Sequence, residues 1–365
     1  MQALILVGGE GTRLRPLTST VPKPVVPLVD RPIIVYMLEW LRGHGIDDVI
    51  MSCGFLATSV HNVLGDGSEM GIRLRFISEP TPLGTGGALK YAAELLDDRF
   101  LMLNGDVITD IDVTAQIAQH EQTGARGTLA MVPVPDPTAY GLIRLNGDNS
   151  IKEFVEKPSS DEVDTKMISA GIYVLERSVL DLIPAGRNAS IERETWPQLV
   201  GNGLYGFPSE AYWLDIGTPQ RYLQGTFDII EGKVATGVRD RLGSSFLDVA
   251  STATINGRVV PPAVIEDGCS VADGAQVGPL VVLGHRVSVD HRTTIERSVV
   301  LAGSQIGPDC LLRDCIVAAG ARIGAGTQIR NAVLGEGVTI GAGNVLAGGA
   351  RIFPGVTLGD RAISF

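Results

Sequence analysis

The stretch LVGGEGTRLRPLTSTVPKP, residues 6–24, combines glycines with basic side chains at close spacing. Glycine has no side chain, so backbone N–H groups can approach a bound group closely. Arg13, Arg15 and Lys23 follow the glycines at fixed offsets, and guanidinium and ammonium groups suit a densely charged anion. For the glycines alone, a turn followed by solvated charges is the simpler alternative. With the cations included, the stretch predicts an anion-binding loop.

This loop differs from two common phosphate-binding loops. Leu14 stands where the dinucleotide-binding fingerprint has its third glycine. The stretch also lacks the Gly-Lys-Ser/Thr ending of a P-loop. The pattern therefore indicates another class of phosphate-binding site.

The stretch resembles GGxGTRLxPLTxxxPKP, the signature of sugar-1-phosphate nucleotidyltransferases (nucleotide-sugar pyrophosphorylases). Further segments resemble motifs of that family in the family's order: EPTPLGTGGA at 79–88, NGD at 104–106, YGLI at 140–143, FVEKP at 154–158, SAGIYV at 169–174 and WLDIGTP at 213–219. The resemblance implies an enzyme that joins a nucleoside triphosphate to a sugar-1-phosphate and releases pyrophosphate.

The implied reaction needs charge neutralisation rather than a general base. An already anionic oxygen of the sugar-1-phosphate would attack the α-phosphorus of the triphosphate. By resemblance, Arg13 and Lys23 would stabilise the departing pyrophosphate as catalytic residues. The resemblance assigns nucleotide binding to residues of the glycine loop and of the segment that begins at 79: Leu6, Gly8, Gly9, Gly11, Thr12, Glu79, Gly84, Thr85 and Gly86.

The resemblance also implies a magnesium ion and a sugar-phosphate site. Asp106 and Asp215 would hold Mg²⁺, a cation that prefers oxygen ligands, and Asp106 is also assigned a catalytic role. A lone aspartate at a strand end is more often a cap or turn residue. Lys157 would meet the sugar phosphate. The sugar-phosphate set is Gly141, Glu156, Lys157, Ser169 and Gly171, where Ser169 departs from the asparagine of many relatives.

Within the family, PLGTGGA, SIERETWP at 190–197 and a short repeat tail are most similar to mannose-1-phosphate guanylyltransferases. That similarity implies GTP and mannose-1-phosphate as substrates and GDP-mannose as product. Relatives that use thymidine or uridine triphosphates carry glutamine in place of Glu79. Three alternatives stay open: a glucose-1-phosphate thymidylyl- or uridylyltransferase, a non-catalytic sugar-nucleotide-binding regulatory subunit, and an added acyl-transfer activity at His285 and His291.

Alternating strand and helix patterns must position these residues. Over residues 1–232, runs such as QALILV, DVIMSC and RFLMLN indicate strands, and segments such as PIIVYMLEWLRGHG have helical spacing. The alternation predicts an α/β fold, a Rossmann-like nucleotidyltransferase domain with a mixed, mostly parallel sheet. Ligands bind beyond the carboxyl ends of such strands. The glycine loop, NGD and WLDIG each follow a strand-like run.

From about residue 251, aliphatic residues recur every six positions. They are Ile265, Val271, Val277, Leu283, Val289, Ile295 and Leu301; the register then slips, resumes at Ile323 and Ile329, and holds again at Ile340, Leu346, Ile352 and Leu358. This period predicts a parallel β-solenoid over residues 251–365, which resembles the left-handed β-helix of hexapeptide-repeat proteins. We expect this tail to act as scaffold, joined to the catalytic domain by a linker at 233–250, and we expect the chain to form a homo-oligomer.

Composition narrows the class of protein further. The chain has 365 residues and a formal net charge of −11, which disfavours nucleic acid and anionic membranes as partners. The N-terminal apolar run is too short for a signal sequence, and the four cysteines form no C-x-x-C pair. We therefore expect a cytoplasmic enzyme without a zinc knuckle or a disulfide framework.

Overall fold

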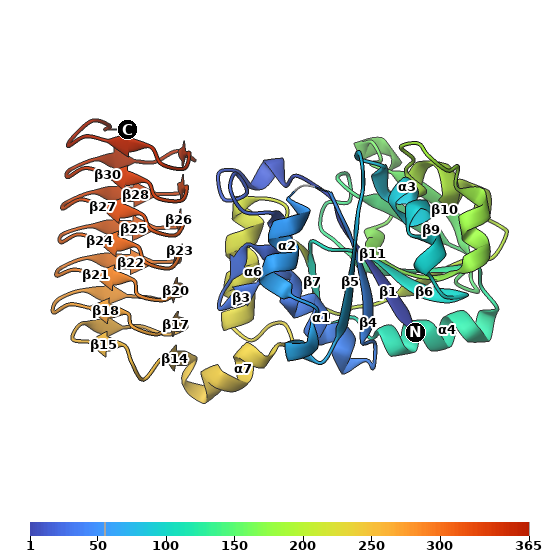
Figure 1. Cartoon of the computed structure of the whole chain (residues 1–365), viewed down its shortest axis with the longest axis horizontal. Helices are drawn as coiled ribbons and strands as arrows, with labels where there is room; N and C mark the ends of the chain where they lie inside the picture. Colours follow the sequence, from blue (N-terminus) through green and yellow to red (C-terminus); the bar gives the residue numbers. More distant parts are fainter. Residues whose placement is uncertain (55, 365) are drawn as a thin grey trace. The chain divides into compact units, whose positions relative to one another are not determined.

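The computed structural model describes residues 1–54 and 56–364 (Figure 1). By packing, the chain forms two units, and each unit combines two segments of the sequence. The first unit contains Met1–Glu10 and Ile34–Trp213, and the second contains Gly11–Ile33 and Leu214–Phe365. Most of the glycine- and arginine-rich stretch therefore packs with the C-terminal part of the chain. The domain boundaries expected from the sequence, at 232 and 250, stay predictions.

The first unit contains a nine-stranded mixed sheet. Its parallel part runs through β5 (Arg73–Ser78), β4 (Asp48–Cys53), β1 (Gln2–Val7) and β6 (Arg99–Asn104). The antiparallel strand β11 (Met167–Glu176) continues the sheet from β6 to β9 (Gly141–Leu145) and β10 (Ile151–Glu156). β8 (Gly127–Pro133) also pairs with β11, and β12 (Leu204–Pro208) pairs with β8 in parallel. The predicted α/β class with a mixed, mostly parallel sheet is confirmed.

Alternating apolar residues on these strands build a core on one face of the sheet. Leu4, Phe100, Met102 and Tyr173 belong to one buried cluster, which also contains Trp196. The helices of this unit are α1 (Ile33–Gly43), α2 (Ala57–Leu64), α3 (Gly84–Tyr91), α4 (Val113–Thr123) and α5 (Trp196–Leu199). None of the helices in the described ranges is long and apolar enough to span a membrane.

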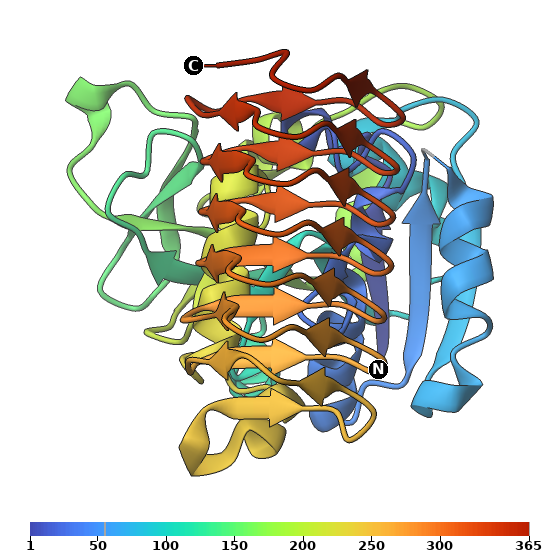
Figure 2. The ribbon, with the colours of Figure 1, turned by 90° about the vertical axis from the view of Figure 1, so that its left-hand side faces the viewer.

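The C-terminal part of the second unit is a parallel β-helix with three sheets, and Figure 2 shows its coils stacked one above another. The first sheet contains β14 (Leu247–Val249), β17 (Ala263–Ile265), β20 (Val281–Leu283), β23 (Ser298–Val300), β26 (Ile316–Val317), β29 (Val333–Leu334) and β32 (Arg351–Ile352). The second contains β15 (Thr254–Ile255), β18 (Ser270–Val271), β21 (Ser288–Val289), β24 (Gln305–Ile306), β27 (Arg322–Ile323), β30 (Thr339–Ile340) and β33 (Thr357–Leu358). The third contains β16 (Arg258–Val259), β19 (Gln276–Val277), β22 (Thr294–Glu296), β25 (Leu311–Arg313), β28 (Gln328–Arg330) and β31 (Val345–Leu346). The predicted solenoid is confirmed.

The first slip in the six-residue period has a local cause. Val300, rather than the predicted Leu301, is the register partner of Leu283 and belongs to the inner core. A single residue, Arg297, joins β22 to β23, and it adopts a left-handed backbone conformation with φ of 47°. The corner is one residue short of the hexapeptide pattern, and the left-handed turn closes it.

Two helices precede the β-helix. α6 (Pro219–Ile230) begins after Thr218, whose side chain accepts a hydrogen bond from the Arg221 amide. α7 (Gly237–Leu242) follows, and β14 already pairs with β17. β14 lies near the end of the segment interpreted as the linker, and its three residues are too few to show a repeat in the sequence.

Candidate active site

Asp106 lies at the carboxyl end of a central parallel strand. β1 and β6 pair with Leu6 opposite Asn104, and the Gly105 amide donates to the Leu6 carbonyl over 2.9 Å. A β-carbon at Gly105 would lie only 2.4 Å from Cγ1 of Val7. Glycine therefore lets the NGD segment turn across the end of β1. This turn places Asp106 beside the start of the glycine loop.

Glu79, which directly follows β5, reaches the same edge of the sheet. A β-carbon at Gly8 would be 3.1 Å from Oε1 of Glu79, whereas one at Gly9 would meet no atom within 4 Å. The Ser52 hydroxyl donates to Oε1 over 2.9 Å, and the Leu83 amide donates to Oε2 over 3.1 Å. An ionised carboxylate has about four acceptor positions, so Glu79 is fixed in place and retains acceptor capacity next to Gly8.

The PLGTGG segment forms the start of α3 and packs against residues 189–192. Gly84 has a φ of +70°, and a β-carbon there would be 2.7 Å from the Ala189 carbonyl oxygen. The same carbonyl accepts from the Gly86 amide over 2.9 Å, and the Thr85 hydroxyl donates to Glu192 over 2.6 Å. These bonds hold α3 in position. The nucleotide-binding role assigned to Gly84, Thr85 and Gly86 stays a prediction.

Gly141, Glu156 and Lys157 lie together on the antiparallel part of the sheet. Gly141 is the register partner of Glu156, and a β-carbon at Gly141 would be 2.4 Å from the Phe154 ring and 3.2 Å from Oε2 of Glu156. Lys157 has a left-handed backbone with φ of 53°, and its amide donates to the Tyr140 carbonyl over 2.9 Å. The close approach of these two strands therefore depends on glycine at position 141.

The Glu156 carboxyl is half-buried, and its surroundings change its pKa. Burial is the main cause that raises the pKa of this carboxyl above its ordinary value, and the negative charge of Glu192 adds to the increase. The positive charges of Lys157 and Arg193 act in the opposite direction. Glu156 therefore keeps its proton to a higher pH than a solvated glutamate does.

Ser169 and Gly171 lie on β11, next to the NGD segment. Gly171 has a φ of +73°, and a β-carbon there would be 2.7 Å from Nδ2 of Asn104. The Ser169 hydroxyl donates to the Tyr173 hydroxyl over 3.1 Å and accepts from the Gly171 amide over 3.4 Å. The strand thus brings the predicted sugar-phosphate residues of β11 close to the turn that holds Asp106.

In the second unit, Gly11 brings the loop against Lys23. Gly11 has a φ of +61°, and a β-carbon there would be 3.1 Å from Cβ of Lys23 and 3.2 Å from Cγ2 of Thr18. The Thr18 hydroxyl donates to the Gly11 carbonyl over 2.8 Å. Thr12 and Arg13 follow in a short 3₁₀ turn that buries Leu14 and leaves Thr12 and Arg13 exposed.

Arg13 and Asp215 converge at Gly217. A β-carbon at Gly217 would lie 2.7 Å from Oδ1 of Asp215 and 2.8 Å from Nη2 of Arg13. Any side chain at this position would displace the carboxylate or the guanidinium group. Within the second unit, the structure therefore brings together a predicted metal ligand and a predicted catalytic cation.

The nucleotidyl transferase family matches residues 2–232, which is more than half of the chain. The chain belongs to this family. A second family, described as the GMPPB C-terminal domain, matches residues 259–363.

Two relatives of this nucleotidyl transferase are named for the same activity. A Mycobacterium tuberculosis protein named mannose-1-phosphate guanylyltransferase is 38% identical over 100% of this chain and 98% of the relative. A Yarrowia lipolytica protein named mannose-1-phosphate guanyltransferase is 42% identical over 62% of this chain and 63% of the relative.

A solved structure is similar to the N-terminal part of this nucleotidyl transferase. It is HddC from Yersinia pseudotuberculosis complexed with GMP-PN. It is 28% identical, with a TM-score of 0.54, and the similarity covers 62% of this chain and 99% of that chain.

The structure of this nucleotidyl transferase adds candidate site residues that the sequence did not reveal. Trp213 donates from Nε1 to the Ala170 carbonyl over 2.9 Å, and its ring lies edge-on to Tyr140 at 5.4 Å. Trp213 thus braces the residues next to Gly171 and Gly141. Asn104, Tyr140 and Trp213 all lie in quoted motifs, which was the available signal. Glu192 lies in the SIERETWP segment, and its bond to Thr85 links distant parts of the sequence.

Proposed function

We propose that this protein transfers a guanylyl group from GTP to mannose-1-phosphate, forming GDP-mannose and pyrophosphate. The observation that carries nucleotidyl transfer is the convergence of Arg13 and Asp215 at Gly217, beside a loop in which Gly11 packs on Lys23. The name of the full-length relative from M. tuberculosis supports guanine as the base and mannose as the sugar.

The chain's own residues act by binding and charge neutralisation. Backbone amides of Gly8 and Gly9 are suited to the phosphates, because a nest of N–H groups attracts anions. Arg13 and Lys23 supply positive charge where pyrophosphate departs, which stabilises the transition state more than the ground state. The attacking phosphate oxygen is already anionic, so no side chain needs to remove a proton.

We also propose that Asp106 and Asp215 hold Mg²⁺. Their carboxylate oxygens suit a hard cation, and Mg²⁺ usually takes one or two carboxylates and completes its shell with phosphate oxygens and water. The described residues contain no group of three His, Cys, Asp or Glu side chains that could hold a metal. When bound, the ion would neutralise triphosphate charge and polarise the α-phosphate.

Pyrophosphate release over a grid of triphosphates and sugar-1-phosphates tests the proposal. GTP with mannose-1-phosphate should give the highest kcat/KM. A preference for dTTP or UTP with glucose-1-phosphate would support the thymidylyl- or uridylyltransferase alternative instead. Binding of GDP-mannose without turnover of any pair would support the non-catalytic alternative.

Glu79→Gln is expected to weaken guanine recognition by about 1–3 kcal/mol, or roughly ten- to a hundredfold in kcat/KM for GTP. Guanine presents two donors, N1–H and the 2-amino group, and a carboxylate can accept from both. A glutamine can keep its oxygen toward the Leu83 amide and turn its amino group toward Ser52, which can accept. The variant therefore changes the chemistry at Gly8 and keeps the local fold.

The readout is kcat/KM for GTP, dTTP and UTP in both proteins, and the gap between GTP and the other two should narrow in Glu79→Gln. Ser52→Ala is the matched control, because it removes one hydrogen bond to the Glu79 carboxylate and leaves the carboxylate in place. Unchanged base preference in Glu79→Gln would leave Glu79 with only its structural contacts.

Acidification is expected to raise the KM for the sugar-1-phosphate by about three- to tenfold. Protonation turns one oxygen of the Glu156 carboxylate from an acceptor into a donor and weakens its bonds to sugar hydroxyls, and the raised pKa means that the ionised form is lost at a higher pH than for a solvated glutamate. The KM should be measured from neutral to mildly acidic pH in wild type and in Glu156→Gln. The Gln variant keeps the titration of the substrate's own phosphate, so superimposable profiles would contradict the role of Glu156.

A further inference from the structure

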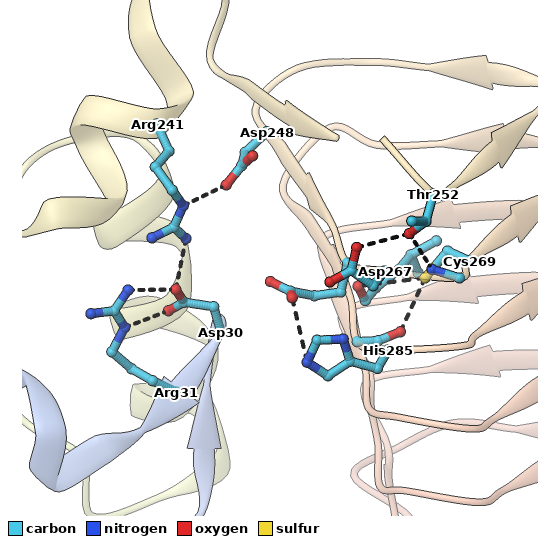
Figure 3. A network of polar contacts seen from close by, with 12 residues as sticks. Asp30, Arg31, Arg241, Asp248, Thr252, Asp267, Cys269 and His285 are labelled. Atoms are coloured by element: carbon cyan, nitrogen blue, oxygen red, sulfur yellow. Dashed lines mark hydrogen bonds and ion pairs between the residues drawn. The ribbon is translucent and has the colours of Figure 1, made fainter. Parts of the chain in front are cut away.

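The segment 11–33, which carries Arg13 and Lys23, forms hydrogen bonds with α7 and with the β-helix. Near its end, Asp30 accepts a hydrogen bond from Arg241 over 2.7 Å (Figure 3). Arg241 belongs to α7 and also donates to Asp248 of β14 over 2.8 Å. The C-terminal end of segment 11–33 is therefore held near β14, where the first coil begins.

The N-terminal part of segment 11–33 is held by later coils of the β-helix. Nη1 of Arg351, in β32, donates to the Arg13 carbonyl over 3.2 Å and to the Arg15 carbonyl over 3.0 Å. The Thr20 hydroxyl donates to Oε2 of Glu336 over 2.7 Å, and Glu336 lies in the turn after β29. The charged side chains of Arg351 and Glu336 therefore contact the N-terminal part of segment 11–33 directly.

Arg351 contacts a particular subset of the loop carbonyls. Four other carbonyls accept from amides within the loop, at 2.9–3.2 Å: Gly11 from Leu14, Thr12 from Arg15, Leu14 from Leu17, and Pro16 from Ser19. Arg351 donates to the carbonyls of Arg13 and Arg15, which alternate with these. The guanidinium group therefore complements the hydrogen bonding of the turn from outside it.

Apolar packing between the segment and the β-helix is interrupted. A cavity of about 250 Å³ lies between them, and its lining includes Leu17 and Val21 from the segment and Leu301, Ala302 and Ala318 from the coils. Side chains on opposite sides of this cavity make fewer apolar contacts with each other than close-packed side chains do. The hydrogen bonds that Arg351 and Glu336 form with this part of the segment therefore contribute a larger part of the interaction that holds it.

We propose that Arg351 is a positioning residue for nucleotidyl transfer, acting through the backbone on either side of buried Leu14 to direct Arg13. The inference rests on the function proposed above. With Leu14 fully buried and the flanking carbonyls held, the Arg13 side chain is directed to the point at Gly217 that Asp215 also reaches. Misplacing a reacting group by about 1 Å can cost about a hundredfold in rate. The β-helix, expected from sequence to be scaffold, thereby takes part in shaping the site.

The test compares Arg351→Met with wild type in the full-length protein. Methionine keeps much of the apolar stem and removes the donors. We expect kcat to fall about tenfold while KM for both substrates stays within about twofold, because the loop bonds affect the transition state most. Hydrogen exchange of residues 12–20, measured without substrates, should become about tenfold faster. Arg351→Lys, which can still donate, should recover part of both losses.

Arg330→Met is the matched control, because Arg330 is an exposed arginine on β28, in a different sheet of the same β-helix. An equal loss in this control, or a kcat within about twofold of wild type in Arg351→Met, would overturn the proposal. Unchanged exchange of residues 12–20 would overturn it as well. If the wild-type protein turned over no substrate pair, the proposed function would fail, and the exchange data would separately report whether Arg351 holds the loop.

Discussion

Asp106→Asn is expected to lower kcat by about a thousandfold or more, because the variant removes a full negative charge from a proposed Mg²⁺ ligand. Asparagine has nearly the same shape, so the turn of NGD across the end of β1, which depends on Gly105, should remain. Asp215→Asn should have a comparable effect, because it removes the negative charge of the other proposed Mg²⁺ ligand. The measurement is single-turnover pyrophosphate release with Mg²⁺ present.

Asp112→Asn is the control for this prediction. Asp112 accepts from the Ala115 amide as the N-cap of α4, and asparagine caps helices equally well. This variant should keep the wild-type rate. Full wild-type activity in excess EDTA, or a rate for Asp106→Asn within about twofold of wild type, would count against the metal assignment.

Lys23→Met is expected to lower kcat by about a hundredfold and to change the KM for GTP much less. The Lys23 charge matters most as pyrophosphate departs, and at 9% exposure it acts where water screens it less than at the surface. Methionine keeps the β-carbon that lies against Gly11 and keeps most of the stem. Lys152→Met, at an exposed position on β10, should leave kcat unchanged. A variant altered only in KM would assign Lys23 to substrate binding alone.

Local sequence rules predicted those parts of the site that depend on single strands and their turns. β1 and β6 follow from apolar runs, and the glycine after β6 follows from the close approach of the chain to β1, as Gly105 illustrates. Asp106 was predicted to lie at the ligand-binding edge of the sheet from one rule, that the carboxyl ends of parallel strands lie at the same edge. These features depend on neighbours within a few residues or on adjacent strands.

Features that depend on distant partners could not be predicted in the same way. Nothing in the spacing of residues 11–33 indicates that they pack with Leu214–Phe365 rather than with the sheet that precedes and follows them. The sequence likewise gives no indication of the hydrogen bond from Thr85 to Glu192. The Val300 register was missed for a different reason, because Val299, Val300 and Leu301 are all aliphatic and only the tight corner at Arg297 selects among them.

The route of the chain through the two units has a consequence for biosynthesis. Residues 11–33 leave the ribosome early, yet the bond between Thr20 and Glu336 spans 316 residues, and the bond between Arg351 and Arg13 spans 338. Such contacts close long loops and form late, whereas N-terminal regions usually fold as they emerge. The sheet strands that flank the segment can begin to pair while the segment itself waits for the last coils. In this protein the segment 11–33 is among the first parts to be synthesised and among the last to be fixed in place.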